Sequence, residues 1–391
     1  MIVLQIILAT ILAYLTLSGL YQAVLALASG IRLKAQDVQK EKYNRFLVLV
    51  PAYKCDEVIL QSVKKNMGMK YLYPKTHFDI TVIADQIESS TKEKLEELGA
   101  RVHSVSFEKS TKAKSLQSAI TANEEQYDAV VVLDADNIAG INFLNKANHA
   151  LNSGQKIIQG NRKAANKNSA FALLDGLSEA ANTKMLCQGA NALGLSSKLS
   201  GSAMVFEYEL FAEAIMKMEA IGGFDKELEL YFTRQGDYIH YANELVVLDE
   251  KISDSGAFAK QRGRWLQAQY NFFKVSLVPA CQELFKGNKD YFHKTMQLAL
   301  PPRALSPFVL VAASAIAFLA GLQALALIGL LGFMLTIGSY LLVLNIDDLF
   351  TNAIKIASAL PALSISVIKS LAIMKRAKTE FIHTEHKVAI S

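Results

Sequence analysis

The sequence predicts an α/β domain with a mostly parallel sheet, held between apolar helices that cross a membrane. Three observations lead to this prediction. Apolar, strand-like runs alternate with helical stretches over residues 46–133, which is the pattern of a parallel α/β sheet. Residues 1–31 and 304–346 contain no charged side chain, whereas charge is normally distributed between them. The expected strands end in polar or turn residues, which places a polar site along one edge of the sheet.

Composition excludes several simpler classes of protein. Of the 391 residues, 51% are hydrophobic and 20% are charged, and the mean hydropathy is +0.21. Together with the uncharged stretches, this excludes a simple cytosolic enzyme, a disordered protein and a small disulfide scaffold. Cys55, Cys187 and Cys281 are too far apart for a zinc or disulfide framework, which fits a reducing compartment. The net charge of +5 is not clustered with aromatic residues, so lipid headgroups and phosphate-bearing ligands are expected, and nucleic acid is not.

The first uncharged stretch predicts one membrane-spanning helix over residues 2–29, since about 20 apolar residues cross a bilayer. A cleaved signal peptide is the alternative, but no basic residue precedes the apolar stretch. The basic residues follow it instead: Arg32, Lys34, Lys40, Lys42 and Arg45. Because positive charge stays in the cytoplasm, the N-terminus is expected outside and the following domain inside.

The second uncharged stretch, residues 304–346, predicts two crossings with a turn near residues 321–323. As a single helix its 43 residues would be about 65 Å long, against roughly 30 Å of hydrocarbon. The last apolar stretch, residues 356–368, has only 13 residues and contains Pro361. It is expected to lie in the membrane interface, with a third crossing as the alternative. A cytoplasmic tail is expected from the basic residues that follow: Lys375, Arg376 and Lys378.

Three apolar runs predict the strands that form the site. They cover residues 46–50, 78–84 and 129–133, with helices expected over residues 57–67, 90–98 and 112–122. Ligands of open α/β sheets bind at the carboxyl ends of the strands. The residues that follow these strands are Pro51-Ala52-Tyr53, Asp85 and Asp134-Ala135-Asp136.

Asp134 and Asp136 are the clearest candidate metal ligands. Mg²⁺ and Mn²⁺ prefer oxygen ligands and accept one or two carboxylates together with substrate phosphates. A solvated turn is the alternative, because Asp-x-Asp is common, but the preceding buried strand favours a site. Lysines near the start of the helix expected over residues 112–122 can receive phosphate oxygens, although taken alone an exposed charged helix is the better explanation. These lysines are Lys109, Lys112 and Lys114.

Residues 261–265 read Gln-Arg-Gly-Arg-Trp and contain the only tryptophan of the chain. The indole face of Trp265 can stack on a sugar or a base. The alternative is an aromatic residue at headgroup depth on an interface helix.

Together, these features resemble a membrane-bound family 2 glycosyltransferase, of the branch that contains cellulose, chitin and hyaluronan synthases. The resemblance covers about residues 43–275 and rests on four motifs in order. They are Pro51-Ala52-Tyr53 (nucleotide-pocket entry), Asp85 (uracil binding), Asp134-Ala135-Asp136 (metal binding) and Gln261…Arg264-Trp265 (the QxxRW motif). Two weaker matches are Lys112–Leu116, after the uracil pocket, and Ser200–Ala203, beside the acceptor.

The resemblance implies a GT-A (Rossmann-like) nucleotide-sugar domain with a mixed, mostly parallel sheet, plus transmembrane helices. The implied donor-binding residues are Pro51, Ala52, Tyr53, Asp85, Lys114 and Asp134. The implied acceptor-binding residues are Gly201, Ser202, Gln261 and Trp265. Asp134 and Asp136 are the implied ligands of Mg²⁺ or Mn²⁺, and Asp225 and Arg264 are the implied catalytic residues. The expected parts are a helix (1–31), the GT-A domain (32–275), interface helices (276–303), two spans (304–346) and an interfacial helix with its tail (347–391).

Two positions depart from the family pattern. Lys54-Cys55 stands where an Asn-Glu pair is usual. Phe224 replaces the Glu of the catalytic Glu-Asp pair, which leaves Asp225 as the expected base. Glu227 and Glu229 are the alternative bases.

The implied reaction is inverting transfer of a sugar from a UDP-sugar to a growing β-linked polysaccharide, extruded through the membrane segments of the enzyme. One alternative is transfer of a single sugar to a lipid-linked acceptor. Another is an inactive scaffold subunit of a polysaccharide machine, suggested only by Phe224. Expected partners are the UDP-sugar, a carbohydrate acceptor, membrane lipids and export or accessory subunits. The expected location is a bacterial inner membrane with the catalytic domain in the cytoplasm, and glucose, N-acetylglucosamine and glucuronate donors all remain open.

Overall fold

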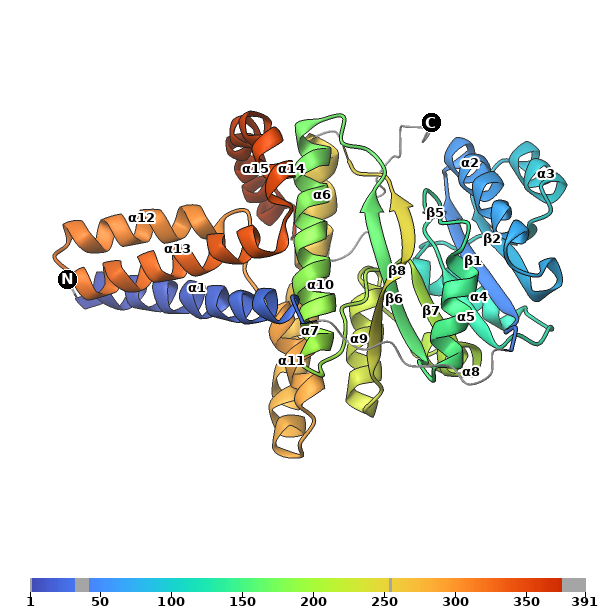
Figure 1. The fold of residues 1–391 in the computed structure, drawn as a ribbon, viewed down its shortest axis with the longest axis horizontal. Helices are drawn as coiled ribbons and strands as arrows, with labels where there is room; N and C mark the ends of the chain where they lie inside the picture. Colours follow the sequence, from blue (N-terminus) through green and yellow to red (C-terminus); the bar gives the residue numbers. More distant parts are fainter. Residues whose placement is uncertain (1, 32–41, 253–254, 375–391) are drawn as a thin grey trace.

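The computed structural model describes residues 2–31, 42–252 and 255–374, and it shows a sheet domain from which a bundle of apolar helices projects (Figure 1). The basic residues expected to orient the chain, Arg32, Lys34, Lys40, Lys375, Arg376 and Lys378, lie outside the described residues. The cysteines Cys55, Cys187 and Cys281 are all free thiols, as the sequence predicts.

The sheet is mixed and mostly parallel, which confirms the predicted fold class. Its eight strands lie in the order β3-β2-β1-β4-β7-β6-β8-β5. Their bounds are β1 Phe46–Tyr53, β2 Phe78–Asp85, β3 Arg101–Val105, β4 Ala129–Val132, β5 Ile138–Ala139, β6 Ile157–Ala164, β7 Met204–Glu207 and β8 Ile239–Asp249. β3, β2, β1 and β4 are parallel, β7 is antiparallel to β4 and β6, and β8 is parallel to β6 but antiparallel to β5.

Helices cover both faces of the sheet, and β1 is therefore buried on both sides. Val48 and Val50 pack into one apolar cluster and Leu47 and Leu49 into the other, as the alternation of side chains along a strand requires. The first face carries α2 Asp56–Asn66, α3 Ser89–Glu97 and α5 Phe143–Asn152. The second face carries α4 Lys112–Thr121, α8 Tyr208–Ile215 and α9 Phe224–Gln235. Two short 3₁₀ turns, η1 Met67–Tyr71 and η2 Lys75–His77, link α2 to β2.

A second group of helices joins the sheet domain to the apolar bundle. α6 Ala170–Asn182 continues through a π-helical turn, η3 Thr183–Gly189, into α7 Ala190–Ala192. Beside it lie α10 Ser255–Phe285 and α11 Lys289–Leu298. Gly189 is essential to the junction, because a Cβ there would lie 2.1 Å from the carbonyl oxygen of Leu25. The first apolar helix can therefore rest directly on η3.

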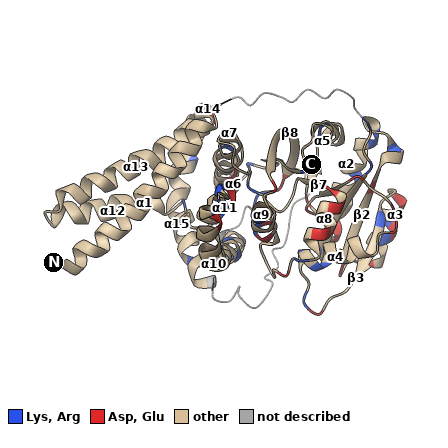
Figure 2. Ribbon diagram, turned by 90° about the horizontal axis from the view of Figure 1, so that it is seen from below, with Lys and Arg blue, Asp and Glu red and all other residues tan. Residues whose placement is uncertain are grey.

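The projecting bundle consists of α1 Ile2–Ala28, α12 Ser306–Leu319 and α13 Gln323–Val343 (Figure 1). Figure 2 shows it free of coloured charged residues along its length. Small residues let the helices touch, since a Cβ on Gly19 would lie 2.9 Å from Thr336 Oγ1. The turn between α12 and α13 falls at residues 320–322, where the sequence predicts it.

Three of the described helices are long and apolar enough to cross a membrane: Ile2–Ala28, Gln323–Val343 and Ala353–Ala372. α12 has only 14 residues, or about 21 Å of helix, which is short for a complete crossing. α14 Ile346–Thr351 leads into α15 Ala353–Ile373, which is longer than the 13-residue interface segment predicted because it includes Lys355 and Lys369. Both views show α15 at the base of the bundle rather than alongside its three helices (Figures 1 and 2), where its apolar face packs with Leu174 of α6 and Phe258 of α10.

Candidate active site

Three carboxylates meet at one edge of the sheet. Asp134 and Asp136 directly follow β4, and Asp249 is the last residue of β8. β4 and β8 run in the same direction, because β4 is antiparallel to β7, β7 to β6, and β6 is parallel to β8. Their carboxyl ends therefore reach the same edge, and one oxygen of each carboxylate lies within 4.8 Å of the others. The sequence predicts the first two members of this acidic triad and misses Asp249.

The acidic triad offers only oxygen ligands, which suits a hard divalent cation such as Mg²⁺ or Mn²⁺. Asp136 and Asp249 are each 4% exposed. The Asn137 side-chain amide donates to Asp136 Oδ1 at 2.9 Å and to Asp249 Oδ1 at 2.8 Å. It therefore fixes the two buried carboxylates relative to each other before any ligand binds.

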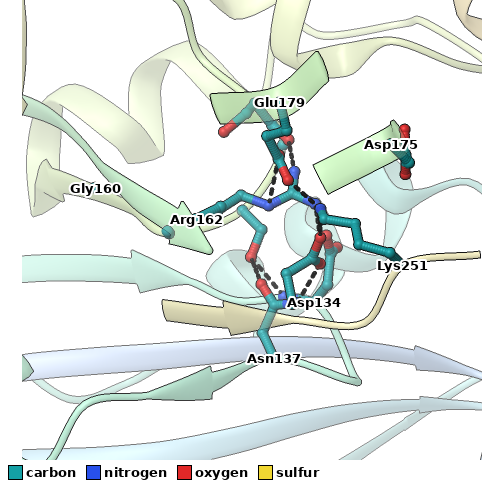
Figure 3. A network of polar contacts seen from close by, with 12 residues as sticks. Asp134, Asn137, Gly160, Arg162, Asp175, Glu179 and Lys251 are labelled. Atoms are coloured by element: carbon teal, nitrogen blue, oxygen red, sulfur yellow. Dashed lines mark hydrogen bonds and ion pairs between the residues drawn. The ribbon is translucent and has the colours of Figure 1, made fainter. Parts of the chain in front are cut away.

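Two largely buried cationic side chains, Arg162 and Lys251, pair with Asp249, and Figure 3 shows both of them converging with Glu179. Arg162 Nη2 donates to Asp249 Oδ2 at 2.7 Å, and Lys251 pairs with both Asp249 and Glu179. Arg162 Nε lies 3.5 Å from Glu179 Oε1. Burial alone would raise the pKa of Asp249, but Arg162 and Lys251 hold it well below its ordinary value. Asp249 is therefore ionised, which is the form of a carboxylate that coordinates a cation.

One lysine reaches the triad from the start of α4. Lys112 forms an ion pair with Asp134 and donates to the carbonyl oxygen of Gly201 at 2.6 Å. Lys114, the lysine named from the family resemblance, instead donates to the carbonyl oxygen of Lys109 at 3.2 Å on the surface. The structure therefore brings Lys112 into the site and leaves Lys114 beside it. Thr111 caps α4 by accepting from the Lys114 backbone N–H at 3.2 Å, which fixes where Lys112 emerges.

The Ser200–Ala203 segment forms the floor of the site. Ser202 is fully buried, accepts from the Asp134 backbone N–H at 2.9 Å and donates to Asn137. Gly201 has a φ of +81°, a conformation that favours glycine. Of the two predicted acceptor residues in this segment, Ser202 supports the metal ligands and only Gly201 lies at the surface of the site.

Asp225 stands across Gly201 from the triad. A Cβ on Gly201 would lie 4.0 Å from Asp225 Cβ and 3.9 Å from Phe224 Cε1. Gly223 occupies the N-cap position of α9, so Asp225 is not the helix cap. Burial raises the pKa of Asp225, but the charges of Lys226 and Lys198 outweigh it and hold the pKa below its ordinary value. The Lys226 ammonium is 3.2 Å from Asp225 Oδ2.

The two alternative bases are occupied by backbone donors. Glu227 accepts from the backbone N–H groups of Glu219 and Ala220, at 3.1 Å and 2.9 Å. Glu229 is buried and accepts from the backbone N–H of Leu199. Both carboxylates hold neighbouring loops in place, whereas Asp225 makes no such backbone contact across the fold.

Asp85 lies at the end of β2 with an unsatisfied carboxylate. It is 1% exposed, and neither of its oxygens has a hydrogen-bond partner in the described part of the chain. Burying a carboxylate without a hydrogen-bond partner costs free energy. The two oxygens of Asp85 are therefore suited to accept hydrogen bonds from a ligand. Asp85 pairs in register with Tyr53 at the end of β1, and the Pro51–Tyr53 segment therefore borders the same corner.

The Gln261–Trp265 segment lies on α10 and is linked to the triad through α6. Arg262 reaches α6, where its Nη2 donates to Asp175 Oδ1 at 2.6 Å. Its guanidinium lies 4.8 Å from the Trp265 ring centroid, and that ring is 40% exposed. Gln261 is half-buried, and burial lowers the pKa of Arg264.

Four contributors to the site are absent from the sequence-based prediction. They are Asn137, Arg162, Asp249 and Lys251. One signal for Asp249 is present in the sequence: residues 245–248, Leu-Val-Val-Leu, form a short apolar run that is followed by Asp249, as the apolar run of β2 is by Asp85. The ion pair of Arg162 with Asp249 depends on β6 and β8 being neighbours, which no local pattern reveals.

The chain belongs to the family described as "Glycosyltransferase like family 2", whose model matches residues 44–268. No curated protein sequence matches. Among solved structures, a mannosyltransferase from Pyrobaculum calidifontis, solved with GDP-Man and Mn²⁺, is similar over 92% of this chain and 99% of its own, with 16% identity and a TM-score of 0.56. Glucosyl-3-phosphoglycerate synthase from Mycobacterium tuberculosis, solved with Mn²⁺, UDP and phosphoglyceric acid, covers 54% of this chain and 72% of its own, with 20% identity and a TM-score of 0.38. The first similarity confirms the GT-A-like fold.

Proposed function

We propose that this protein is a metal-dependent glycosyltransferase that moves one sugar from a nucleotide-diphosphate sugar to a lipid-linked acceptor at the membrane surface. The acidic triad at the carboxyl edge of the sheet carries the proposal. It lies in a chain of glycosyltransferase-like family 2, and its oxygen ligands fit Mn²⁺ or Mg²⁺. The similar mannosyltransferase was solved with Mn²⁺.

The bound cation would neutralise negative charge on the diphosphate as it leaves. Lys112, which lies beside Asp134, would add positive charge at the same place. Asp225 would accept the proton of the acceptor hydroxyl while that oxygen bonds to the anomeric carbon and the bond to the diphosphate breaks. A single displacement of this kind inverts the anomeric centre. Arg264 stays a predicted contributor of positive charge.

Asp85 would recognise the base of the donor. Its two unpartnered oxygens require N–H donors, and uracil and guanine both present N–H groups on their pairing edges. A UDP-sugar is the donor implied by the sequence, and GDP-mannose, which the similar mannosyltransferase was solved with, fits the same carboxylate. Both belong in any test of the donor.

Single transfer fits the membrane bundle better than extrusion of a polymer. A Cβ on Gly329 would lie 2.0 Å from Ser314 Oγ, and one on Gly332 would lie 2.4 Å from Thr16 Oγ1. The described helices of the bundle therefore touch along their length, and a sugar chain needs a wide opening. The proposed arrangement places α1, α12 and α13 in the membrane, α15 along its interface and the sheet domain in the cytoplasm.

The test is incubation of the purified protein and a membrane lipid extract with labelled UDP-glucose, UDP-N-acetylglucosamine, UDP-glucuronate and GDP-mannose, each with Mn²⁺. One labelled sugar on a lipid is expected from one of these donors, and a ladder of long products would instead establish the polysaccharide synthase. Asp136→Asn should abolish incorporation. Asp79→Asn, at the opposite edge of the sheet beside Arg101, is the matched control and should keep it. Absence of incorporation from every donor would favour an inactive scaffold.

A further inference from the structure

An arginine without a counter-charge among the described residues lies where the apolar bundle meets the sheet domain. Arg303 is half-buried and lies three residues before α12. Its Nη1 is buried, without a hydrogen-bond partner in the described part of the chain. Among the described residues no carboxylate forms an ion pair with it. An arginine stays protonated in proteins, and a buried charge without a partner costs several kcal/mol. The Arg303 guanidinium is therefore available to bind an anion that is not part of the chain.

The surroundings of Arg303 add positive charge and polar hydroxyl groups. The described groups that act on it electrostatically are the hydroxyls of Tyr340 and Tyr21 and the like-charged guanidinium of Arg262. Tyr21 comes from α1 and Tyr340 from α13, and both pack in one apolar cluster with Leu300. Asp175 neutralises Arg262 at 2.6 Å. These residues, Arg303 with Tyr21 and Tyr340, are called the Arg303 site. The site carries one positive charge at the base of the bundle that no described residue compensates, together with two hydroxyl groups.

Phosphate is the anion that best fits the Arg303 site. A guanidinium binds phosphate oxygens through two parallel N–H donors, and it is the usual side chain for this purpose. Tyr21 and Tyr340 belong to the C-terminal parts of α1 and α13, which face the sheet domain (Figure 1) and lie where lipid headgroups would be if the bundle spans the membrane. We propose that Arg303 binds the phosphate group of the lipid that carries the acceptor, an inference that rests on the proposed transfer to a lipid-linked acceptor.

A series of interactions joins the Arg303 site to the acidic triad. Arg303 interacts electrostatically with Arg262, which pairs with Asp175 on α6. Glu179 is one helical turn further along the same face of α6 (Figure 3). It pairs with Lys251, which in turn pairs with Asp249. The phosphate of a lipid held at Arg303 would thus be positioned relative to the metal ligands through a single rigid helix.

The same phosphate chemistry is present in bulk phospholipids and in free phosphate, so the test must separate them. The probe is farnesyl phosphate, titrated in detergent into the full-length protein without donor and followed by native mass spectrometry. The comparison ligands are farnesol, phosphatidylglycerol and inorganic phosphate. Arg303→Gln is expected to weaken farnesyl phosphate binding about 10- to 100-fold, since a hydrogen bond to a charged group is lost. Arg303→Lys should restore part of it.

The control is Arg101→Gln. It also removes one positive charge, but from β3 at the edge of the sheet, where Arg101 pairs with Asp79. It should bind farnesyl phosphate like the wild type. Equal binding by wild type and Arg303→Gln would overturn the proposal, as would equal binding of farnesol. Phosphatidylglycerol or inorganic phosphate binding as tightly as farnesyl phosphate would overturn the assignment to an acceptor lipid. Mn²⁺-dependent binding of UDP and GDP, measured on the same samples, tests the glycosyltransferase proposal separately, because it does not involve Arg303.

Discussion

Asp225→Asn separates proton transfer from structural support at the start of α9. The asparagine keeps the size of the side chain but cannot accept a proton from the acceptor hydroxyl. Turnover should fall by roughly 10²–10⁴-fold, with Mn²⁺-dependent donor binding unchanged. The lost ion pair with Lys226, 3.2 Å away and with both side chains 14% exposed, should cost about 1–3 kcal/mol of stability.

Lys226→Gln is the matched control, because it breaks the same ion pair and keeps the carboxylate. It should lose similar stability but keep most of its turnover. Lys226 also helps to hold the pKa of Asp225 low, against the opposing effect of burial, so the control should shift the acid limb of the kcat profile to higher pH. In the wild type Asp225 is protonated at equilibrium only as pH falls through its lowered pKa, so the acid limb should lie below the pH range in which an ordinary aspartate titrates.

The assay is single-turnover transfer from the active donor to the lipid acceptor, with thermal unfolding measured in the same detergent. Near-normal turnover of Asp225→Asn would refute the assignment of Asp225 as the base. Inactivity of Glu227→Gln with an unchanged melting temperature would then move the base to Glu227, against its present role in accepting from Glu219 and Ala220.

Three further predictions concern stability and topology. Burial holds the pKa of His293 at about 3, so below pH 6.5 the folded protein binds fewer protons than the unfolded chain. The free energy of unfolding should therefore fall by about 2 kcal/mol from pH 7 to pH 5. His293→Gln should reduce this loss, as measured by thermal unfolding at the two pH values. Gly189→Ala places a Cβ 2.1 Å from a carbonyl oxygen of α1 and should cost about 1–3 kcal/mol, whereas Gly68→Ala, with open space around it, should leave the melting temperature unchanged. In a variant without native cysteines, an impermeant thiol reagent outside intact cells should label Gln323→Cys but not Lys217→Cys; the reverse pattern would invert the proposed topology.

Local sequence patterns were sufficient for three of the eight strands, β1, β2 and β4, and for most of the bundle. The run over residues 46–50 is apolar at every position, as a strand buried on both faces requires, and the structure places it in β1 at the middle of the sheet. The turn between α12 and α13 follows from length alone, because 43 uncharged residues exceed one bilayer. α15 was predicted too short, since charge was taken to end the helix, whereas Lys355 and Lys369 are accommodated within it.

The site was predicted only where its residues end or follow a strand that the sequence reveals. Asp85 ends β2, and Asp134 and Asp136 follow β4. Asp249 ends β8, which was not predicted from the sequence and which lies beyond β7 and β6 in the sheet. The choice between Lys112 and Lys114 depends on where α4 begins, and a one-residue change in a helix start turns a side chain by about 100°. Such details follow from tertiary packing and cap geometry, not from composition or spacing.

The central claim is that Asp134, Asp136 and Asp249 together hold a divalent cation that the reaction requires. The most direct measurement is the electron paramagnetic resonance spectrum of Mn²⁺ titrated into EDTA-treated protein with UDP or GDP, followed by transfer assays on the same samples. The account predicts one tightly bound Mn²⁺ in the wild type, weak or absent binding in Asp136→Asn and Asp249→Asn, and transfer that is lost with EDTA and restored by Mn²⁺. Undiminished transfer in EDTA, or Mn²⁺ bound equally well by both variants, would contradict it.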